Sequence, residues 1–210
     1  GSDVAQSKPS DVLEYTASSA AAAFCLGQDG VIANILDFTS YSSDTPDFWR
    51  KDTEKFPSHG GRFTGEPAYF AHVIGASQAM LKKARMNPAD FDFAVFHMPN
   101  AKFPKEAAKR LGFTDAQLKP GFVVPHIGNP YSASSMVGLA AVLDVAKKGN
   151  KIFMCSYGSG AGSDAFVIEV TKEINPFRRK NNDTVAKQIA NKEYMDYSLI
   201  ARNILTKYRI

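Results

Sequence analysis

Three polar clusters in the sequence combine residue types that acyl chemistry needs. They are His97 in Phe-His-Met-Pro, Asn129 in Gly-Asn-Pro, and residues 156–160, which read Ser-Tyr-Gly-Ser-Gly. A histidine can donate to a carbonyl or relay a proton, and an asparagine can orient a water or hold an oxygen. A glycine-rich turn exposes backbone N–H groups, which can stabilise an oxyanion. The three clusters together suit a site at which negative charge develops on an oxygen.

Each cluster also has a structural explanation. A single histidine at the end of a strand is most often structural, and His126 also ends a predicted strand, so it could equally be the active one. Asn129 before Pro130 fits a turn, and residues 158–160 fit a tight hairpin between two strands. The residue types alone leave these alternatives open.

The two cysteines, Cys25 and Cys155, lie in apolar runs. Cys155 could be a nucleophile, but alternation along a strand puts it on the face opposite Ser156. If Ser156 faces the pocket, Cys155 packs as a small hydrophobic residue. So few cysteines argue against a disulfide scaffold and for a reducing compartment. We also expect no metal site, because the histidines and cysteines lack the spacing of zinc ligands.

Hydrophobic periodicity and turn residues predict the elements that position these clusters. We expect a β-hairpin formed by 20–27 and 31–38, a long loop over 39–65, a helix over 66–86, a strand over 91–98, a helix over 104–111, a strand over 122–127, a helix over 132–147, strands over 151–157 and 165–171, and a last helix over 185–205. This order predicts an α/β fold with helical crossovers. Each polar cluster then follows a strand, at the sheet edge where α/β proteins bind ligands.

Composition narrows the class of protein. The chain has 210 residues, of which 44% are hydrophobic, with a net charge of +4 and a pI near 9.0. No basic run is interleaved with aromatic residues, so we expect no nucleic-acid partner, and the mild positive charge suits a phosphate-bearing ligand such as coenzyme A. No apolar run approaches the ~18 residues that a membrane helix needs, and no signal peptide is recognisable. We therefore expect a cytoplasmic protein without a membrane partner.

Several motifs resemble those of hydroxymethylglutaryl-CoA synthases, and their order and spacing are also similar to those of ketoacyl synthase III enzymes. The motifs are Phe-His-Met-Pro-Asn-Ala-Lys at 96–102, Gly-Asn-Pro-Tyr-Ser-Ala-Ser-Ser at 128–135, Ser-Tyr-Gly-Ser-Gly at 156–160, and three stretches that resemble the archaeal type at 13–16, 57–67 and 193–197. The resemblance covers nearly the whole chain. It implies the C-terminal half of a thiolase-like fold over 1–171, with a mixed β-sheet and helices packed on its faces. Residues 172–210 would form a charged extension with a terminal helix.

The resemblance implies a two-step reaction. A cysteine takes an acetyl group from acetyl-CoA, and the deprotonated acetyl group then attacks the ketone of acetoacetyl-CoA before hydrolysis releases the product. The substrates are coenzyme A thioesters, and no further cofactor is implied. By motif match, the resemblance implies that His97 holds the acetoacetyl thioester and assists proton transfer, and that Asn129 binds and polarises the acyl group. The Ser159 N–H would contribute to the oxyanion hole, and Lys102 would lie at the coenzyme A entrance. The implied substrate-binding residues are Tyr131, Ser156 and Gly158.

The chain departs from the family in one respect. The nucleophilic cysteine and the general-base glutamate of these enzymes lie in the N-terminal half, and neither Cys25 nor Cys155 lies in a matching motif. Ser156 stands where thiolases carry a second catalytic cysteine, which disfavours thiolase itself. We therefore expect activity only together with an N-terminal half that supplies the cysteine and the glutamate, within a homo- or hetero-oligomer.

Two further functions are weighed against this one. The first is a condensation on acyl carrier protein, as in ketoacyl synthase III. The second is a non-catalytic scaffold in a complex with acetoacetyl-CoA thiolase and an OB-fold bridging protein, although a scaffold would not need His97 or Asn129. For the remaining histidines we expect a loop position at His59, the surface of a helix at His72 and a structural role at His126.

Overall fold

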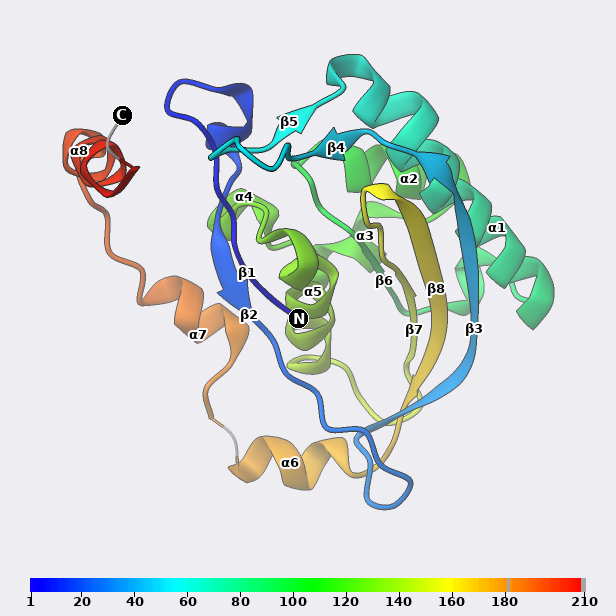
Figure 1. The fold of residues 1–210 in the computed structure, drawn as a ribbon. Coiled ribbons are helices and arrows are strands. Elements are labelled where there is room, and N and C mark those ends of the chain that lie inside the picture. The colour runs from blue at the N-terminus through cyan, green and yellow to red at the C-terminus, as the bar shows by residue number, and fades with distance from the viewer. Residues whose placement is uncertain (181, 209–210) are drawn as a thin grey trace.

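The centre of the molecule is a four-stranded mixed sheet, seen in a computed structural model that describes residues 1–180 and 182–208 (Figure 1). Its strands lie in the order β3 (Ala33–Thr45), β8 (Gly160–Val170), β7 (Lys151–Cys155) and β6 (Phe93–Phe96). Strands β6 and β7 are parallel, whereas β7 with β8 and β8 with β3 are antiparallel. The helical segment between β6 and β7 makes the crossover that a parallel pair requires.

Shorter strands and the helices surround this sheet. Two small antiparallel pairs join β1 (Ser2–Val4) to β2 (Ser19–Ala21) and β4 (Phe48–Trp49) to β5 (Ser58–His59). The helices are α1 (Ala71–Ala84), α2 (Phe103–Leu111), α3 (Asp115–Leu118), α4 (Val124–Ile127), α5 (Ser134–Leu143), α6 (Ile174–Lys180), α7 (Val185–Ala190) and α8 (Tyr197–Tyr208). A π-helical turn over Gly65–Phe70 leads directly into α1.

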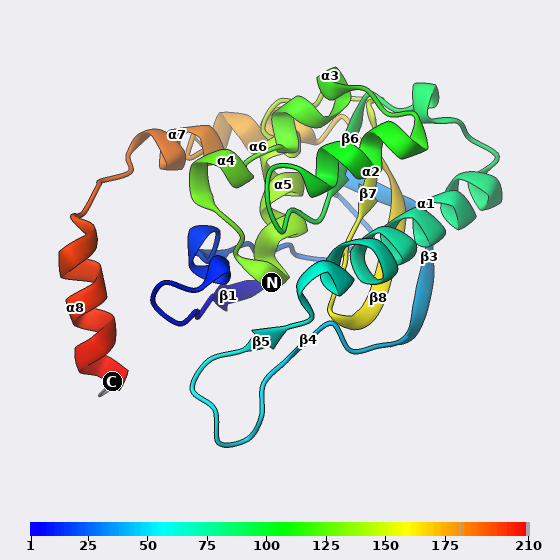
Figure 2. The same cartoon turned by 90° about the horizontal axis from the view of Figure 1, so that it is seen from above.

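Helices cover both faces of the sheet, which confirms the predicted fold class. Helix α1 packs on β3 and β8, whereas α5 packs on β6 and β7 from the other side (Figure 2). Because side chains alternate along a strand, Phe153 and Cys155 of β7 enter the core beneath α1, and Ile152 and Met154 enter the core beneath α5. The near-continuous apolar run of β7 is therefore explained by burial on two faces.

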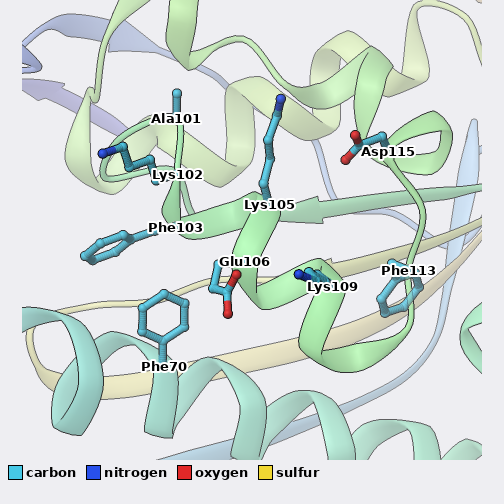
Figure 3. A pocket seen from close by; sticks show the side chains of 9 residues that line it. All are labelled: Phe70, Ala101, Lys102, Phe103, Lys105, Glu106, Lys109, Phe113 and Asp115. Atoms are coloured by element: carbon cyan, nitrogen blue, oxygen red, sulfur yellow. The ribbon is translucent and has the colours of Figure 1, made fainter.

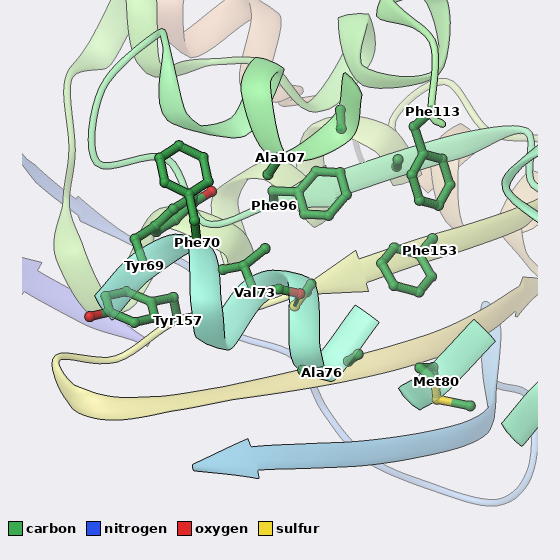
Figure 4. Packing of buried hydrophobic residues seen from close by; sticks show 14 of the residues in the cluster. Tyr69, Phe70, Val73, Ala76, Met80, Phe96, Ala107, Phe113, Phe153 and Tyr157 are labelled. Atoms are coloured by element: carbon green, nitrogen blue, oxygen red, sulfur yellow. Dashed lines mark hydrogen bonds between the residues drawn. The ribbon is translucent and has the colours of Figure 1, made fainter. Parts of the chain in front are cut away.

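The core beneath α1 is rich in aromatic residues and anchors the end of β6. Phe153 is fully buried and its ring centroid lies 5.1 Å from that of Phe113 and 5.9 Å from that of Phe96 (Figure 4). Burying one such ring contributes about 2–3 kcal/mol to stability. Since Phe96 immediately precedes His97, this packing fixes the point at which the predicted site begins.

The predicted hairpin of 20–27 with 31–38 is wrong. Strand β2 pairs with β1, and β3 pairs with β8, over a hundred residues further along the chain. The Asp29-Gly30 bend does form, with Gly30 at φ 64°. A local turn signal thus sets the bend without choosing the strand partners, which are decided by long-range packing.

Two further predicted elements are wrong for identifiable reasons. Strand β3 continues to Thr45, so the loop expected from residue 39 begins later, and its exposed polar side chains are compatible with a strand at the edge of the sheet. Residues 122–127 were expected to form a strand, but helix α4 occupies 124–127 and no strand forms. Pro125 stands at the start of α4, where proline is tolerated, whereas in a central strand it would remove a hydrogen-bond donor.

The C-terminal segment has two helices where one was expected over 185–205. Helices α7 and α8 are separated by residues 191–196, and α8 lies at the edge of the molecule in Figure 1, where the Tyr197 hydroxyl donates to the Glu14 carboxylate at 3.0 Å. The first part of the C-terminal segment packs against the rest of the protein, because Ile174 is fully buried and the Val185 N–H donates to the Asp144 carboxylate. A domain boundary at residue 172 stays a prediction. No helix among the described residues is long and apolar enough to cross a membrane.

Candidate functional site

His97 follows β6 and is held through both of its backbone polar groups. Its N–H donates to the Cys155 carbonyl at 2.9 Å, and its own carbonyl accepts from the Tyr69 hydroxyl at 2.8 Å. The imidazole is only 7% exposed, and its centroid lies 6.4 Å from the Tyr69 ring and 6.0 Å from the Tyr157 ring. Burial lowers the pKa of His97 to about 4. The ring is therefore neutral at pH 7, with one nitrogen as donor and the other as acceptor.

The turn at 156–160 connects β7 to β8. Gly158 and Gly162 exchange two backbone hydrogen bonds of 2.8 and 2.9 Å, so the hairpin interpretation of this turn is confirmed. The Gly158 N–H is consumed by that pairing, and the Ser156 hydroxyl accepts from the Asp164 N–H at 3.2 Å. Within the part of the chain that the structure describes, the Ser159 N–H has no hydrogen-bond partner. This leaves it free for the predicted oxyanion role, which stays a prediction.

Asp47 is a component of this site that the sequence did not reveal. It is fully buried, and its carboxylate accepts from the Tyr157 hydroxyl at 2.8 Å, the Gly160 N–H at 3.3 Å and the Ser159 hydroxyl at 3.4 Å. Burial and the adjacent carboxylate raise the pKa of Tyr157. Asp47 thus fixes the turn on both sides of Ser159. In sequence it is one acidic residue of a predicted loop, with no spacing that links it to residue 157.

Asn129 lies in a loop clamped by the N-terminal segment. Its N–H donates to the Thr16 carbonyl at 2.5 Å, and its carbonyl accepts from the Ser18 N–H at 3.2 Å. Gly128 has φ +77°, and a Cβ there would lie 2.6 Å from the Thr16 oxygen, so only glycine fits. The Asn129 Oδ1 accepts from the Tyr131 N–H at 2.9 Å, so this oxygen orders the local turn. The predicted role of Asn129 towards an acyl oxygen stays a prediction.

Direct contacts connect the three predicted clusters. The N–H of Met98, next to His97, donates at 3.0 Å to the hydroxyl of Ser134, the first residue of α5, which follows the Asn129 loop. The rings of Phe48 and Tyr131 lie 5.5 Å apart, which brings that loop beside the segment that carries Asp47. The His97 end of β6, the Asn129 loop and the 156–160 turn therefore form one region.

Lys102 lies at an open groove on α2. The groove has a volume of about 900 Å³. Its lining comprises Phe70, Ala101, Lys102, Phe103, Lys105, Glu106, Lys109, Phe113 and Asp115 (Figure 3). Lys102, Lys105 and Lys109 are exposed and follow one another along the helix. This cationic groove fits the predicted position of Lys102 at the entrance for a phosphate-bearing substrate.

Cys155 packs in the core as predicted. It is fully buried, its thiol donates to the Val73 carbonyl at 3.7 Å, and burial raises its pKa to about 12. A thiol with so high a pKa is a poor nucleophile at neutral pH. Cys25 is exposed. Among the described residues, no three or more His, Cys, Asp or Glu side chains form a group that could hold a metal ion.

None of the other three histidines lies in the surroundings that the sequence predicted. His72, expected on a helix surface, is 1% exposed, because α1 turns it inwards where its ring nitrogens lie 2.6 Å from the Ala68 carbonyl and 2.8 Å from the Ser43 hydroxyl. His126 is exposed on α4, so burial does not support a structural role. His59 lies in the two-residue strand β5 and its Nδ1 accepts from the Gly61 N–H.

The lowered pKa of His97 predicts a pH-dependent stability. Between its folded pKa of about 4 and the ordinary value of 6.5, the unfolded chain binds one proton more than the folded chain. The free energy of unfolding therefore falls as the pH drops through this window. Chemical denaturation at pH 7 and pH 4 should show that His97→Gln removes about 3 kcal/mol of this loss. His126→Gln is the exposed control, and an equal pH effect in both variants would contradict the assignment.

Comparisons with known proteins agree with this geometry. Residues 81–170 match the family described as 3-oxoacyl-[acyl-carrier-protein] synthase III C terminal. In structure the chain is similar to a hydroxymethylglutaryl-CoA synthase complexed with CoA, with a TM-score of 0.71 and 21% identity over 93% of this chain and 56% of that one. A synthase from Bacillus subtilis gives a TM-score of 0.74 at 16% identity, covering 96% of this chain and 54% of that one. The chain therefore has a thiolase-like fold.

Curated sequences define the family more closely. The chain is 53% identical over 202 residues to the hydroxymethylglutaryl-CoA synthase of Methanothermobacter thermautotrophicus and 50% identical over 202 residues to that of Picrophilus torridus. Both alignments cover 96% of this chain and 58% of the relative. The chain is therefore similar to archaeal hydroxymethylglutaryl-CoA synthases over almost its whole length, and it spans rather more than half the length of these relatives.

Proposed function

We propose that the chain is the part of a hydroxymethylglutaryl-CoA synthase that binds acetoacetyl-CoA and stabilises the charge that develops during its condensation with an acetyl group. The observation that carries the proposal is that a buried neutral histidine, a clamped asparagine and a turn with a free N–H at Ser159 lie on segments that are in direct contact with one another. These groups match the needs of an aldol-type attack, in which a ketone oxygen becomes an alkoxide. The solved relatives complexed with CoA and with 3-hydroxy-3-methylglutaryl-CoA support this substrate class.

Each group has a defined task in this reaction. A cysteine outside this chain attacks the acetyl-CoA carbonyl, and CoA leaves as the thiol. A carboxylate outside this chain then removes a proton from the acetyl methyl group, and the resulting carbanion attacks the ketone carbon of acetoacetyl-CoA. The alkoxide formed takes up a proton, and water then hydrolyses the thioester to the cysteine, which releases hydroxymethylglutaryl-CoA and restores the thiol. Neutral His97 donates a hydrogen bond to the acetoacetyl unit, and Asn129 and the Ser159 N–H bind acyl oxygens. A neutral donor suits this positioning task because it does not quench the carbanion by giving up its proton.

The unpartnered apolar surface supports a missing portion that completes the enzyme. Leu26 is 82% exposed and Ile35 54%, and both line the same hollow of the surface. An apolar cavity of about 1190 Å³ lies between the 19–35 segment, α5 and α7. Contiguous apolar patches of this kind usually mark an interface. We infer that the portion of the relatives that this chain does not span covers this surface, in the same polypeptide or in another one.

The pair of β1 and β2 supports the same inference. Each strand has three residues, and together they form a separate two-stranded sheet. Isolated two-stranded sheets of this size are marginally stable in water. Further strands from the missing portion would extend this sheet and bury Ala21 and Ala23, which are exposed in this chain.

A substrate comparison tests the proposed activity. The chain, combined with the missing portion, should form hydroxymethylglutaryl-CoA from acetyl-CoA and acetoacetyl-CoA, with at least a hundredfold preference over a malonyl thioester as the second substrate. Product analysis by mass spectrometry measures this preference. A preference for the malonyl thioester would favour a ketoacyl synthase III-like condensation on a carrier protein. The match to the C-terminal family of 3-oxoacyl-[acyl-carrier-protein] synthase III makes this the second candidate. No turnover of either substrate would favour a scaffold.

A further inference from the structure

We infer that Tyr69 is a positioning residue for His97, acting through the hydrogen bond from its hydroxyl to the His97 carbonyl. This inference rests on the proposed function, because it assumes that the His97 ring acts on substrate. Tyr69 is fully buried and belongs to none of the motifs that suggested the site. Its hydroxyl oxygen lies 2.8 Å from the His97 carbonyl oxygen.

The local backbone explains how Tyr69 reaches this position. Residues Gly65–Phe70 form a π-helical turn at the start of α1. π-Helical turns are rare in proteins, but those that occur are often found at functional sites. Here the turn places Tyr69 and Phe70 next to each other on the inner side of the helix (Figure 4), with ring centroids 5.1 Å apart. The phenol therefore enters the core with its hydroxyl directed at the end of β6.

The hydrogen bond completes the support of His97. The His97 N–H is already bound to the Cys155 carbonyl of β7, so strand pairing fixes one side of the residue. The His97 carbonyl lies beyond the end of β6, where no strand partner is available, and Tyr69 supplies the donor. Leaving a buried carbonyl without a donor costs about 1–3 kcal/mol. Without the Tyr69 hydroxyl, the peptide group that follows β6 can avoid that cost by rotating towards another donor. A rotation at His97 would move its imidazole.

The Tyr69 ring also connects His97 to the turn. Its centroid lies 5.4 Å from that of Tyr157, in an edge-to-face arrangement, and the Tyr157 hydroxyl is bound to Asp47. The His97 ring thus lies against two tyrosines, each of which is fixed by its own hydroxyl. Removing one hydroxyl should loosen the imidazole while leaving the aromatic packing in place.

The test is Tyr69→Phe in the complete enzyme, this chain together with the missing portion. We expect the rate of condensation to fall about tenfold, while acetylation of the nucleophile by acetyl-CoA stays within about twofold, because His97 is assigned to the second step only. The pH profile of condensation should also change: water reaching the loosened ring would raise the His97 pKa, so the acid limb should move to higher pH. A residue that only supports the fold would lower both steps together and leave the pH profile in place.

Two further variants make the outcome decisive. Phe91→Leu destabilises the same aromatic core without removing a hydroxyl, and it should leave the ratio of the two steps unchanged. If Tyr69→Phe behaves like Phe91→Leu or like the wild type while His97→Ala blocks condensation, the positioning inference is overturned and the proposed function stands. If His97→Ala itself leaves condensation intact, the proposed function fails, and the inference fails with it.

Discussion

His97→Ala in the complete enzyme is expected to slow condensation with acetoacetyl-CoA about a thousandfold. The reason is geometric and electrostatic: His97 is a buried, neutral imidazole beside the turn at 156–160, and alanine removes its ring donor. Acetylation of the nucleophile should remain within about twofold, since that step needs no contact with the acetoacetyl group. Rapid quenching with labelled acetyl-CoA measures acetylation, and product formation measures condensation.

A matched control separates this effect from a general loss of structure. His126→Ala removes an exposed imidazole on α4 and should change neither step. This comparison also decides between the two histidines that the sequence left as candidates. Equal slowing of acetylation and condensation by His97→Ala would contradict its assignment to the second step.

Asp47→Ala is expected to slow both acetylation and condensation, each about a hundredfold. The substitution leaves the Tyr157 hydroxyl and the Gly160 N–H without their buried acceptor, so the turn that presents the Ser159 N–H loses its order. An oxyanion forms in both steps, and both should therefore suffer. Protein stability should also fall, by about 1–3 kcal/mol, as expected for buried donors left unpaired.

Two related variants test whether the carboxylate acts through the turn. Asp47→Asn keeps one acceptor oxygen at the same place and should recover part of the rate. Asp44→Ala removes a nearby exposed carboxylate and should have no effect, which excludes a general electrostatic cause. The account of Asp47 would be wrong if Asp47→Ala and Asp44→Ala gave the same kinetics at a temperature where both are folded.

Sequence patterns were informative where one segment determines its own structure. The apolar run at 151–157 predicts β7, and Gly112, with φ +89°, ends α2 as its position predicts. Alternation also predicts that Cys155 is turned into the core, away from any nucleophilic role. These features depend on local periodicity and on glycine conformations that can be read directly from the sequence.

The features that sequence did not predict depend on contacts between distant residues. Asp47 meets Tyr157 across 110 positions of the chain, and β3 finds its partner in β8 rather than in the neighbouring apolar run. His72 was expected on a helix surface because residues 39–45, which cover it as part of β3, were predicted to be a loop. Such contacts leave no periodic signal, so the sequence did not reveal the residues that support the candidate site.

The central claim is that this chain supplies the acetoacetyl-CoA side of the site and a different portion supplies the nucleophile. The most direct measurement is to trap the complete enzyme with labelled acetyl-CoA and map the acetylated cysteine by peptide mass spectrometry. We predict that the label lies on a cysteine outside this chain and on neither Cys25 nor Cys155, since Cys155 is buried with its pKa raised to about 12. Stoichiometric acetylation of either of these two cysteines would contradict the account.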